Sequence, residues 1–304
     1  MSPAVPPAEP PAAEDRPRVP AVPASSLVLV RPGAGGEISV FTVRRAGTMA
    51  FSAHATAFPG GRVDPADDLP DRLWEGTDLA DWGRRLGLPH EPVDAHGTLT
   101  ELDPAEGAGR VLAAAVRETF EETGVLLARD AVTGTPVDPA RVAAFPDELR
   151  DAVERHEVDF GELLDREGLR PDAGALVPWS RWITPHGGPR RYDTFFFAVH
   201  LPQGQSPERM SSEAASHGWA SPAELLRRFR AGEVNLMAPT WWQLRTLVDA
   251  GEDIHAGRSR FEPLEGVMLV AGQGPVFPHA DEYLRDLTAF RAAAQVEESK
   301  DNIL

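Results

Sequence analysis

Apolar positions along the chain form short runs with the spacing of strands. The run "SSLVLVRP" (25–32) predicts a buried strand, and "EISVFTVRR" (37–45) alternates as a second strand after the turn residues "PGAGGE". "ALVPWSRWITP" (175–185) predicts a further strand, and the strongest strand pattern covers 193–200. "GVMLVAGQGPVFP" (266–278) predicts that the fold ends with strands.

Longer stretches have helical spacing. The clearest covers 109–123 and ends at Gly124, and 139–168 predicts two amphipathic helices. "SPAELLRRFRAG" (221–232) begins with a serine cap followed by proline, and "APTWWQLRTLVDAG" (238–251) predicts another helix. Strands and helices do not alternate strictly, so the pattern predicts the α+β class, as an α/β/α sandwich.

The polar and proline-rich segments divide the chain. Residues 1–24 contain eight prolines and predict a disordered lead, followed by one domain over 25–290 and a polar tail over 291–304. Residues 68–108 are acidic and rich in glycine and proline, which predicts an insertion with a short helix near "LADWGRRLG".

Composition excludes several classes of function. The chain has no cysteine, which excludes disulfides, thiolate metal sites and a cysteine nucleophile. A net charge of −17 argues against a nucleic-acid or anionic-membrane partner, and there is no apolar run of about 18 residues that would span a membrane. We therefore expect a cytoplasmic protein, and the charge does not argue against a small anionic substrate. The insertion is a candidate lid or homodimer contact.

Three glutamates crowd one helical turn in "AAAVRETFEETG". At about 100° per residue, Glu118, Glu121 and Glu122 share one side of the helix, although like charges at this spacing repel. Apolar residues lie on the opposite side: Leu112, Ala113, Val116 and Phe120. A divalent cation such as Mg²⁺ or Mn²⁺ would turn the repulsion into binding, because both ions prefer carboxylate oxygens. A solvated acidic face is the alternative for the glutamates alone, since the chain has 47 Asp and Glu.

The surroundings of the glutamates resemble the signature of the Nudix hydrolase family, G-x5-E-x7-R-E-U-x-E-E-x-G-U, where U is bulky and aliphatic. The second half matches at Arg117, Glu118, Glu121, Glu122, Gly124 and Val125, and Thr119 departs from it. The first half begins at Gly61, within "FPGG", and has Asp67 where the family has its first Glu. Between Asp67 and Arg117 lie 49 residues where the signature allows seven, so an insertion of about 42 residues separates the two halves.

Further blocks resemble the Nudix branch that includes the animal peroxisomal coenzyme A diphosphatase, which also carries a long insertion in the signature. They are "RR…AFPGGRVDPAD", "PWSRWITP", "RRYDTFFFAV", "GWASPAELL" and "MAPTWWQLRTL". Before "FPGG", where the coenzyme A enzymes have additional basic and glycine positions, this chain has "GTMAFSAHATA". The resemblance implies a mixed central sheet and hydrolysis of a nucleoside diphosphate derivative, with coenzyme A or acyl-coenzyme A as candidate substrates.

The resemblance also implies roles for particular residues. Glu118, Glu121 and Glu122 would bind Mg²⁺ or Mn²⁺ and act in catalysis, and Arg117 would pair with a carboxylate of the signature. Glu213 is a candidate base or additional ligand. The predicted substrate-binding residues are Gly60, Gly61, Arg45 and Arg191. His54, His186 and His217 are candidates for contact with phosphates, and the tryptophans are mainly core candidates, one of which could stack an adenine.

Other functions stay open at this point. Within enzymes, an ADP-ribose or nucleotide-sugar pyrophosphatase would use the same glutamates. A non-catalytic ligand-binding Nudix module is a second alternative, although degenerate modules often lose the glutamates that this chain keeps. An acidic scaffold without a ligand is a third.

Overall fold

The computed structural model describes residues 20–45, 55–88, 102–184, 190–207, 214–251, 254, 263–265 and 277–301. Their strands form a mixed nine-stranded sheet and a two-stranded sheet. The large sheet contains β1 (Ala21–Pro32), β2 (Ile38–Arg45), β3 (Ala55–Ala57), β4 (Gly60–Arg62), β7 (Val177–Ile183), β8 (Arg191–His200), β9 (Ala214–Ala220), β10 (Asn235–Leu236) and β11 (Pro263–Glu265). The small sheet pairs β5 (Ala128–Asp130) with β6 (Leu169–Pro171).

The described helices are of two kinds. The α-helices are α1 (Leu79–Arg85), α2 (Pro104–Thr123), α3 (Pro139–Ala143), α4 (Asp147–Glu154), α5 (Phe160–Arg166), α6 (Pro222–Arg230), α7 (Ala238–Ala250) and α8 (Ala280–Asp301). Short 3-10 helices are η2 (Ala34–Gly36), η3 (Pro65–Asp67), η4 (Asp71–Trp74) and η6 (Ala173–Ala175).

The large sheet is built around β1. This strand pairs in parallel with β8 from Ala21 to Val30, and antiparallel with β2 only at its end, from Val30 to Pro32. Earlier along β1, its partner is the short strand β4, whereas β2 pairs with β3. The turn that joins β3 to β4 therefore lies where β1 and β2 separate.

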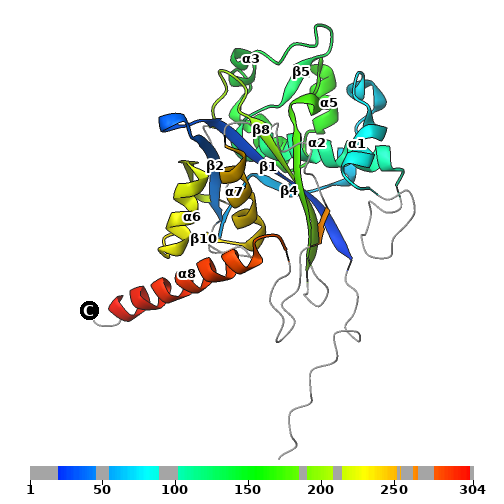
Figure 1. Ribbon diagram of the computed structural model, residues 1–304. Coiled ribbons are helices and arrows are strands. Elements are labelled where there is room, and N and C mark those ends of the chain that lie inside the picture. The colour runs from blue at the N-terminus through cyan, green and yellow to red at the C-terminus, as the bar shows by residue number, and fades with distance from the viewer. Residues whose placement is uncertain are drawn as a thin grey trace, which may run out of the picture.

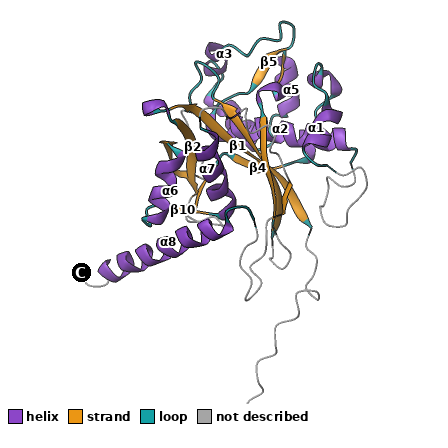
Figure 2. Cartoon of the chain, in the orientation of Figure 1, coloured by secondary structure: helices purple, strands orange, loops and turns teal. Residues whose placement is uncertain are grey.

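Helices cover both faces of the large sheet (Figures 1 and 2). Alternate residues of β1 point to opposite faces. Leu27 belongs to a hydrophobic cluster with Val116 of α2, and Val28 belongs to a second cluster with Leu244 of α7. Helices α1, α2 and α5 lie on the first face and α6, α7 and α8 on the second (Figure 1), which confirms the predicted α+β sandwich with a mixed sheet.

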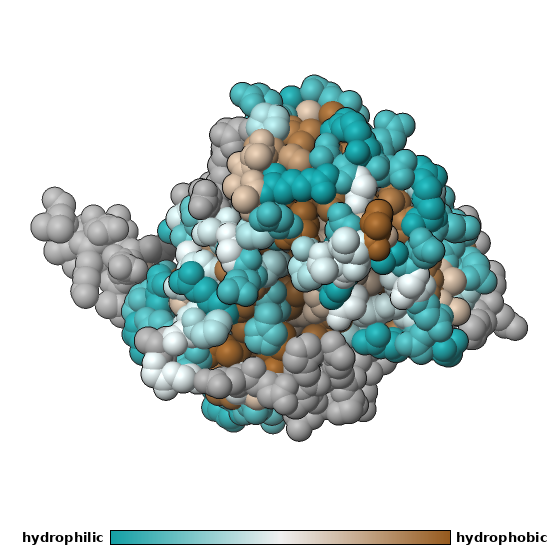
Figure 3. All heavy atoms as spheres, turned by 90° about the horizontal axis from the view of Figure 1, so that it is seen from above, coloured by the Kyte–Doolittle hydropathy of each residue, from teal (hydrophilic) through white to brown (hydrophobic). Residues whose placement is uncertain are grey.

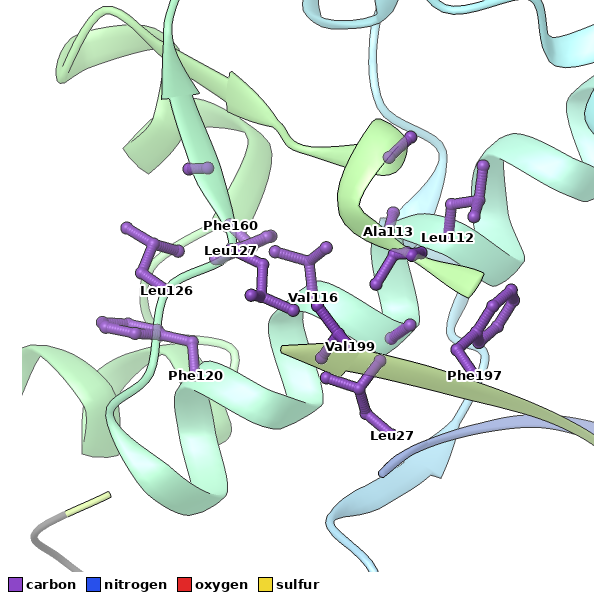
Figure 4. Packing of buried hydrophobic residues seen from close by; sticks show 14 of the residues in the cluster. Leu27, Leu112, Ala113, Val116, Phe120, Leu126, Leu127, Phe160, Phe197 and Val199 are labelled. Atoms are coloured by element: carbon purple, nitrogen blue, oxygen red, sulfur yellow. The ribbon is translucent and has the colours of Figure 1, made fainter. Parts of the chain in front are cut away.

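Helix α2 is anchored to the sheet by its apolar side, as its periodicity predicts. Val116 lies near Val199 at the end of β8, Leu112 lies on the side of Phe197, and Phe120 lies on the side of Leu126 (Figure 4). Asp103 caps the beginning, where its carboxylate accepts the Ala105 N–H at 2.9 Å. The helix begins five residues earlier than predicted because this cap and Pro104 lie inside the predicted insertion.

The predicted insertion packs against α2 through its short helix, α1, which the sequence predicted. The Trp82 ring contacts Phe197 of β8 at 6.3 Å between centroids. At the end of α1, the Gly87 carbonyl accepts Arg181 Nη1 at 2.9 Å, and Arg181 forms a buried ion pair with Asp193. The described part of the insertion is therefore tied to the sheet as well as to α2.

The structure differs from the predicted boundaries in three places. Strand β1 begins at Ala21, within the predicted lead, because its first residues pair with β8. Residues 139–168 contain three helices, since Pro146 disfavours helix at the preceding residue and His156 has a positive φ of 54°. The polar tail is helical to Asp301, because α8 is anchored where Tyr283 joins the second cluster. The strands predicted over 266–276 lie outside the described residues.

The face of the molecule that is seen from above is mainly hydrophilic (Figure 3). Hydrophobic residues appear as separate patches among polar ones when the molecule is seen from above (Figure 3). Among the described residues, the exposed large hydrophobic side chains are Val22, Val132, Met237 and Val248. None of the described helices is long and apolar enough to cross a membrane.

Phe120→Ala should destabilise the protein by about 3–5 kcal/mol, the usual cost of a cavity left by a buried aromatic ring. Phe120 is 1% exposed and its ring contacts Phe145 and Phe160. Urea unfolding followed by circular dichroism would measure the change. Val132→Ala is the control, since Val132 is 94% exposed and should lose almost nothing. Equal losses in the two variants would contradict the packing described for α2.

Candidate active site

The polar side of α2 carries a network of acidic side chains around one arginine. Arg117 is 5% exposed and donates from Nη1 to Glu118 at 3.0 Å and to Glu121 at 3.1 Å. Its Nη2 also donates to the Arg62 carbonyl of β4 at 3.0 Å. The ion pairing that the sequence predicted for Arg117 is therefore present, and it joins α2 to the strand that begins at Gly60.

Asp67 is the strongest partner of Arg117 although it lies 50 residues earlier in the chain. Its carboxylate accepts Nε at 2.8 Å and Nη2 at 3.0 Å, which is the paired geometry of an Arg–carboxylate bond. Asp67 ends η3, and its carboxylate also accepts the Asp64 N–H at 2.7 Å. The fold therefore closes the split signature by bringing its two halves into contact.

The two glycines of "FPGG" allow the loop to approach the glutamates. Gly60 has a φ of 150° and its N–H donates to Glu122 Oε2 at 3.0 Å. A Cβ at Gly60 would overlap the Ser25 carbonyl, and one at Gly61 would overlap the Glu118 carboxylate. Both positions exclude a side chain because β1 or the carboxylate occupies the space.

Burial is the main influence on the pKa values of the carboxyl groups of Glu118, Glu121 and Asp67. It raises the pKa of Glu118 to about 7, against the opposing effect of Arg117 and together with repulsion from Glu121. Burial also raises the pKa of Glu121 and of Asp67, and Arg117 opposes both shifts. Burial lowers the pKa of Arg117, but its ion pairs outweigh this effect and raise it, so the guanidinium stays charged.

The donor set fits a divalent cation of the Mg²⁺ or Mn²⁺ type. Among the described residues, no group of three acidic or histidine side chains has its donor atoms arranged around one point. Glu118 and Glu122 nevertheless offer carboxylate oxygens beside a loop that approaches too closely for a Cβ, and carboxylate is the ligand that these ions prefer. Arg117 supplies one positive charge against Asp67 and three glutamates, so a further cation would reduce the remaining repulsion.

One predicted substrate-binding residue, Arg191, lies away from the glutamates of α2. Arg191 begins β8 opposite Ala21, whereas Gly60 lies opposite Ser26, a separation of roughly 17 Å along β1. Its Nε donates to the Thr184 carbonyl at 2.7 Å, and burial lowers its pKa. The structure does not bring Arg191 together with the glutamates.

Arg45 ends β2, where its backbone pairs with Ala214 of β9 beside an irregularity in the ladder. Glu213, His54 and His186 lie outside the described residues, so the roles of Glu213 as base or additional ligand stay predictions.

Helix α4 adds two residues beside the site that no motif indicated. Arg150 is 8% exposed, and its Nη1 lies 3.0 Å from the point where a Cβ at Gly124 would be. The charge of Glu154 contributes to raising the pKa of Glu121. Both residues come from a segment 25 or more residues after the signature, and their proximity follows from packing of α4 on the end of α2.

Comparison with known proteins places this arrangement in a family. The family model of the NUDT19 Nudix domain matches residues 21–247. The acyl-coenzyme A diphosphatase NUDT19 of Gallus gallus is 33% identical over 243 residues, which cover 70% of this chain and 62% of that protein. The acyl-coenzyme A diphosphatase NUDT19 of Homo sapiens is 29% identical over 305 residues, which cover 90% of this chain and 80% of that protein.

A solved structure supports the same relation. The crystal structure of a Nudix hydrolase from Alicyclobacillus acidocaldarius is 31% identical and has a TM-score of 0.57. It covers 75% of this chain, and the match spans 91% of that protein. The chain thus spans most of this bacterial protein but less than two thirds of the chicken one.

Asp67→Asn should destabilise the protein by about 3 kcal/mol, because it leaves part of a buried guanidinium without its charged partner. Denaturant unfolding at neutral pH would measure the loss. Asp165→Asn is the matched control, since Asp165 forms the same paired bond with Arg72 at the surface. The surface pair should contribute little, and a loss as large as that of Asp67→Asn would contradict the importance of burial.

Glu118 should make the stability of the metal-free protein depend on pH. Its pKa rises from 4.5 to about 7 on folding, so between these values the folded protein binds more protons than the unfolded chain. The free energy of unfolding should therefore fall as pH rises through this window. Urea unfolding with a chelator at several pH values would detect the slope, and Glu118→Gln should reduce it. An unchanged slope in the variant would contradict the assignment.

Proposed function

Because this chain belongs to the Nudix hydrolase family, in the group of the NUDT19 Nudix domain, we propose that it is a metal-dependent diphosphatase of coenzyme A or acyl-coenzyme A. The observation that supports the proposal most is the closed signature, in which Asp67 pairs with Arg117 and Gly60 binds Glu122. The substrate class is inferred from the similarity to the chicken and human acyl-coenzyme A diphosphatases.

In this proposal Glu118, Glu121 and Glu122 hold Mg²⁺ or Mn²⁺. When bound, the ion neutralises diphosphate oxygens and lowers the pKa of the attacking water. Glu122 is oriented by the Gly60 N–H, and Glu118 lies against Gly61, where the absence of a side chain leaves room for its carboxylate. Glu118 must be ionised to bind the ion, so its raised pKa makes metal affinity rise with pH.

Arg117 is a positioning residue in this scheme. Its contacts with Glu118 and Glu121 fix both carboxylates relative to the helix, and Asp67 fixes Arg117 in turn. Such partners commonly change metal affinity or activity 10- to 100-fold when they are removed. The contacts of Arg117 with Glu121 and Asp67 are buried and the contact with Glu118 is partly buried, so water competes with them weakly.

Glu122→Gln should lower turnover at least about 100-fold with every substrate that the wild type hydrolyses, since it removes a proposed metal ligand. The panel is coenzyme A, acyl-coenzyme A, ADP-ribose and NADH, each with Mg²⁺ and with Mn²⁺, with products separated by chromatography. Glu106→Gln is the matched control, because Glu106 lies on the same helix and bonds to Arg110 at the surface; it should retain wild-type turnover.

Release of 3′,5′-ADP from coenzyme A would support the proposed substrate class. Faster hydrolysis of ADP-ribose than of coenzyme A would replace it with the ADP-ribose pyrophosphatase alternative. Wild-type turnover in Glu122→Gln would contradict the metal-site assignment, and a wild type inactive on the whole panel would favour a ligand-binding module.

A further inference from the structure

An aromatic cluster lies on β2 and β9, beside the site described above. Phe41 contacts the His217 ring at 5.5 Å and the Trp219 ring at 5.4 Å between centroids. The Arg31 guanidinium lies over Trp219 at 4.1 Å from the ring centroid. We call Arg31, Phe41, His217 and Trp219 the aromatic shelf.

The aromatic shelf lies on the same face of the sheet as α2. Phe41 belongs to the hydrophobic cluster that contains Val116 and Phe120 of α2, and Trp219 packs against that cluster. In the antiparallel ladder Phe41 is opposite Trp219 and Val43 is opposite His217, and opposite residues share a face. His217 therefore projects from the face that carries the glutamates.

The backbone register places the shelf within reach of the glutamates. Val43 of β2 pairs with His217 on one edge and with Ala57 of β3 on the other, so His217 and Ala57 are about 10 Å apart. Ala57 lies three residues before Gly60, which binds Glu122. The separation between shelf and glutamates is thus on the order of 10–20 Å, the scale of a nucleoside diphosphate.

The exposure of these side chains leaves ring surface for a ligand. His217 and Arg31 are exposed and Trp219 is half-buried, whereas Phe41 is buried beneath them. His217 and Trp219 are two residues apart on one strand, so their Cα atoms are about 7 Å apart. Two stacked rings are separated by about half that distance. A flat ring can therefore lie against His217, or against the Arg31 guanidinium that covers Trp219.

We propose that the aromatic shelf binds the purine ring of the nucleoside diphosphate whose phosphates lie at Glu118 and Glu122. This inference rests on the proposed function, and it specifies where the nucleoside side of the substrate binds. Aromatic rings and guanidinium groups stack on the flat faces of bases, and this stacking does not require hydrogen bonds to the edges of the base. It contributes about 1–3 kcal/mol per base.

Calorimetry with adenosine 5′-monophosphate and with ribose 5-phosphate, each in the presence of Mg²⁺, tests the shelf on the full chain. His217→Ala should weaken adenosine 5′-monophosphate binding about 5-fold or more, from the loss of one stacking contact. Binding of ribose 5-phosphate, which has no base, should change less than about 2-fold. His279→Ala is the matched control, because His279 lies before α8 and contacts Glu282.

Trp219→Leu is a second variant that keeps an apolar side chain against the core, and it should weaken adenosine 5′-monophosphate binding at least as much. Equal weakening of both ligands, unchanged affinity in both variants, or no binding of adenosine 5′-monophosphate by the wild type would overturn the proposal. Base-dependent binding in a wild type that hydrolyses nothing would retain the shelf and reject the proposed function. If the wild type hydrolyses its substrate but the variants bind adenosine 5′-monophosphate with unchanged affinity, the proposed function is retained and the shelf is rejected.

Discussion

The buried guanidinium of Arg117 is the interaction on which the site depends. It joins the end of β4 through the Arg62 carbonyl, η3 through Asp67 and helix α2 through two glutamates. A buried ion pair adds little net stability, because desolvation offsets most of the attraction. The ion pairs of Arg117 instead fix the geometry of the site, because removing any one partner leaves a buried charge without its counterion. The loop, the 3-10 helix and the helix are therefore held in one arrangement.

That arrangement also explains how the long insertion is tolerated. The chain leaves the signature after Asp67 and returns to it at Arg117, within α2. The closure entropy of such a loop grows only slowly with its length. The described part of the insertion packs against α2 and is tied to the sheet at Gly87 by Arg181. The helix that carries the glutamates is thus supported by the inserted residues on one side and by the sheet on the other.

The glutamates of α2 repel one another, and this repulsion is balanced by the packing of the helix. Burial raises the pKa of Glu118 and Glu121, and one arginine does not neutralise all the carboxylates around it. The apolar side of α2, anchored at Val116 and Phe120, supplies the stability that keeps this charge in place. The aromatic cluster around Phe41 shares that same hydrophobic core, so the two ends of the proposed substrate site are anchored in one hydrophobic cluster.

The sequence by itself determined the α+β class, the strands β1, β2, β7 and β8, and the apolar and acidic sides of α2. Periodicity within a helix or strand is enough to predict these features, whereas the pairing of Arg117 with a carboxylate was implied by the resemblance to the Nudix signature. Tertiary structure alone decided that Arg191 lies away from the glutamates, that α4 brings Glu154 near Glu121, and that Phe41, His217 and Trp219 meet. Those outcomes depend on strand register and helix packing between distant segments, which local periodicity does not specify.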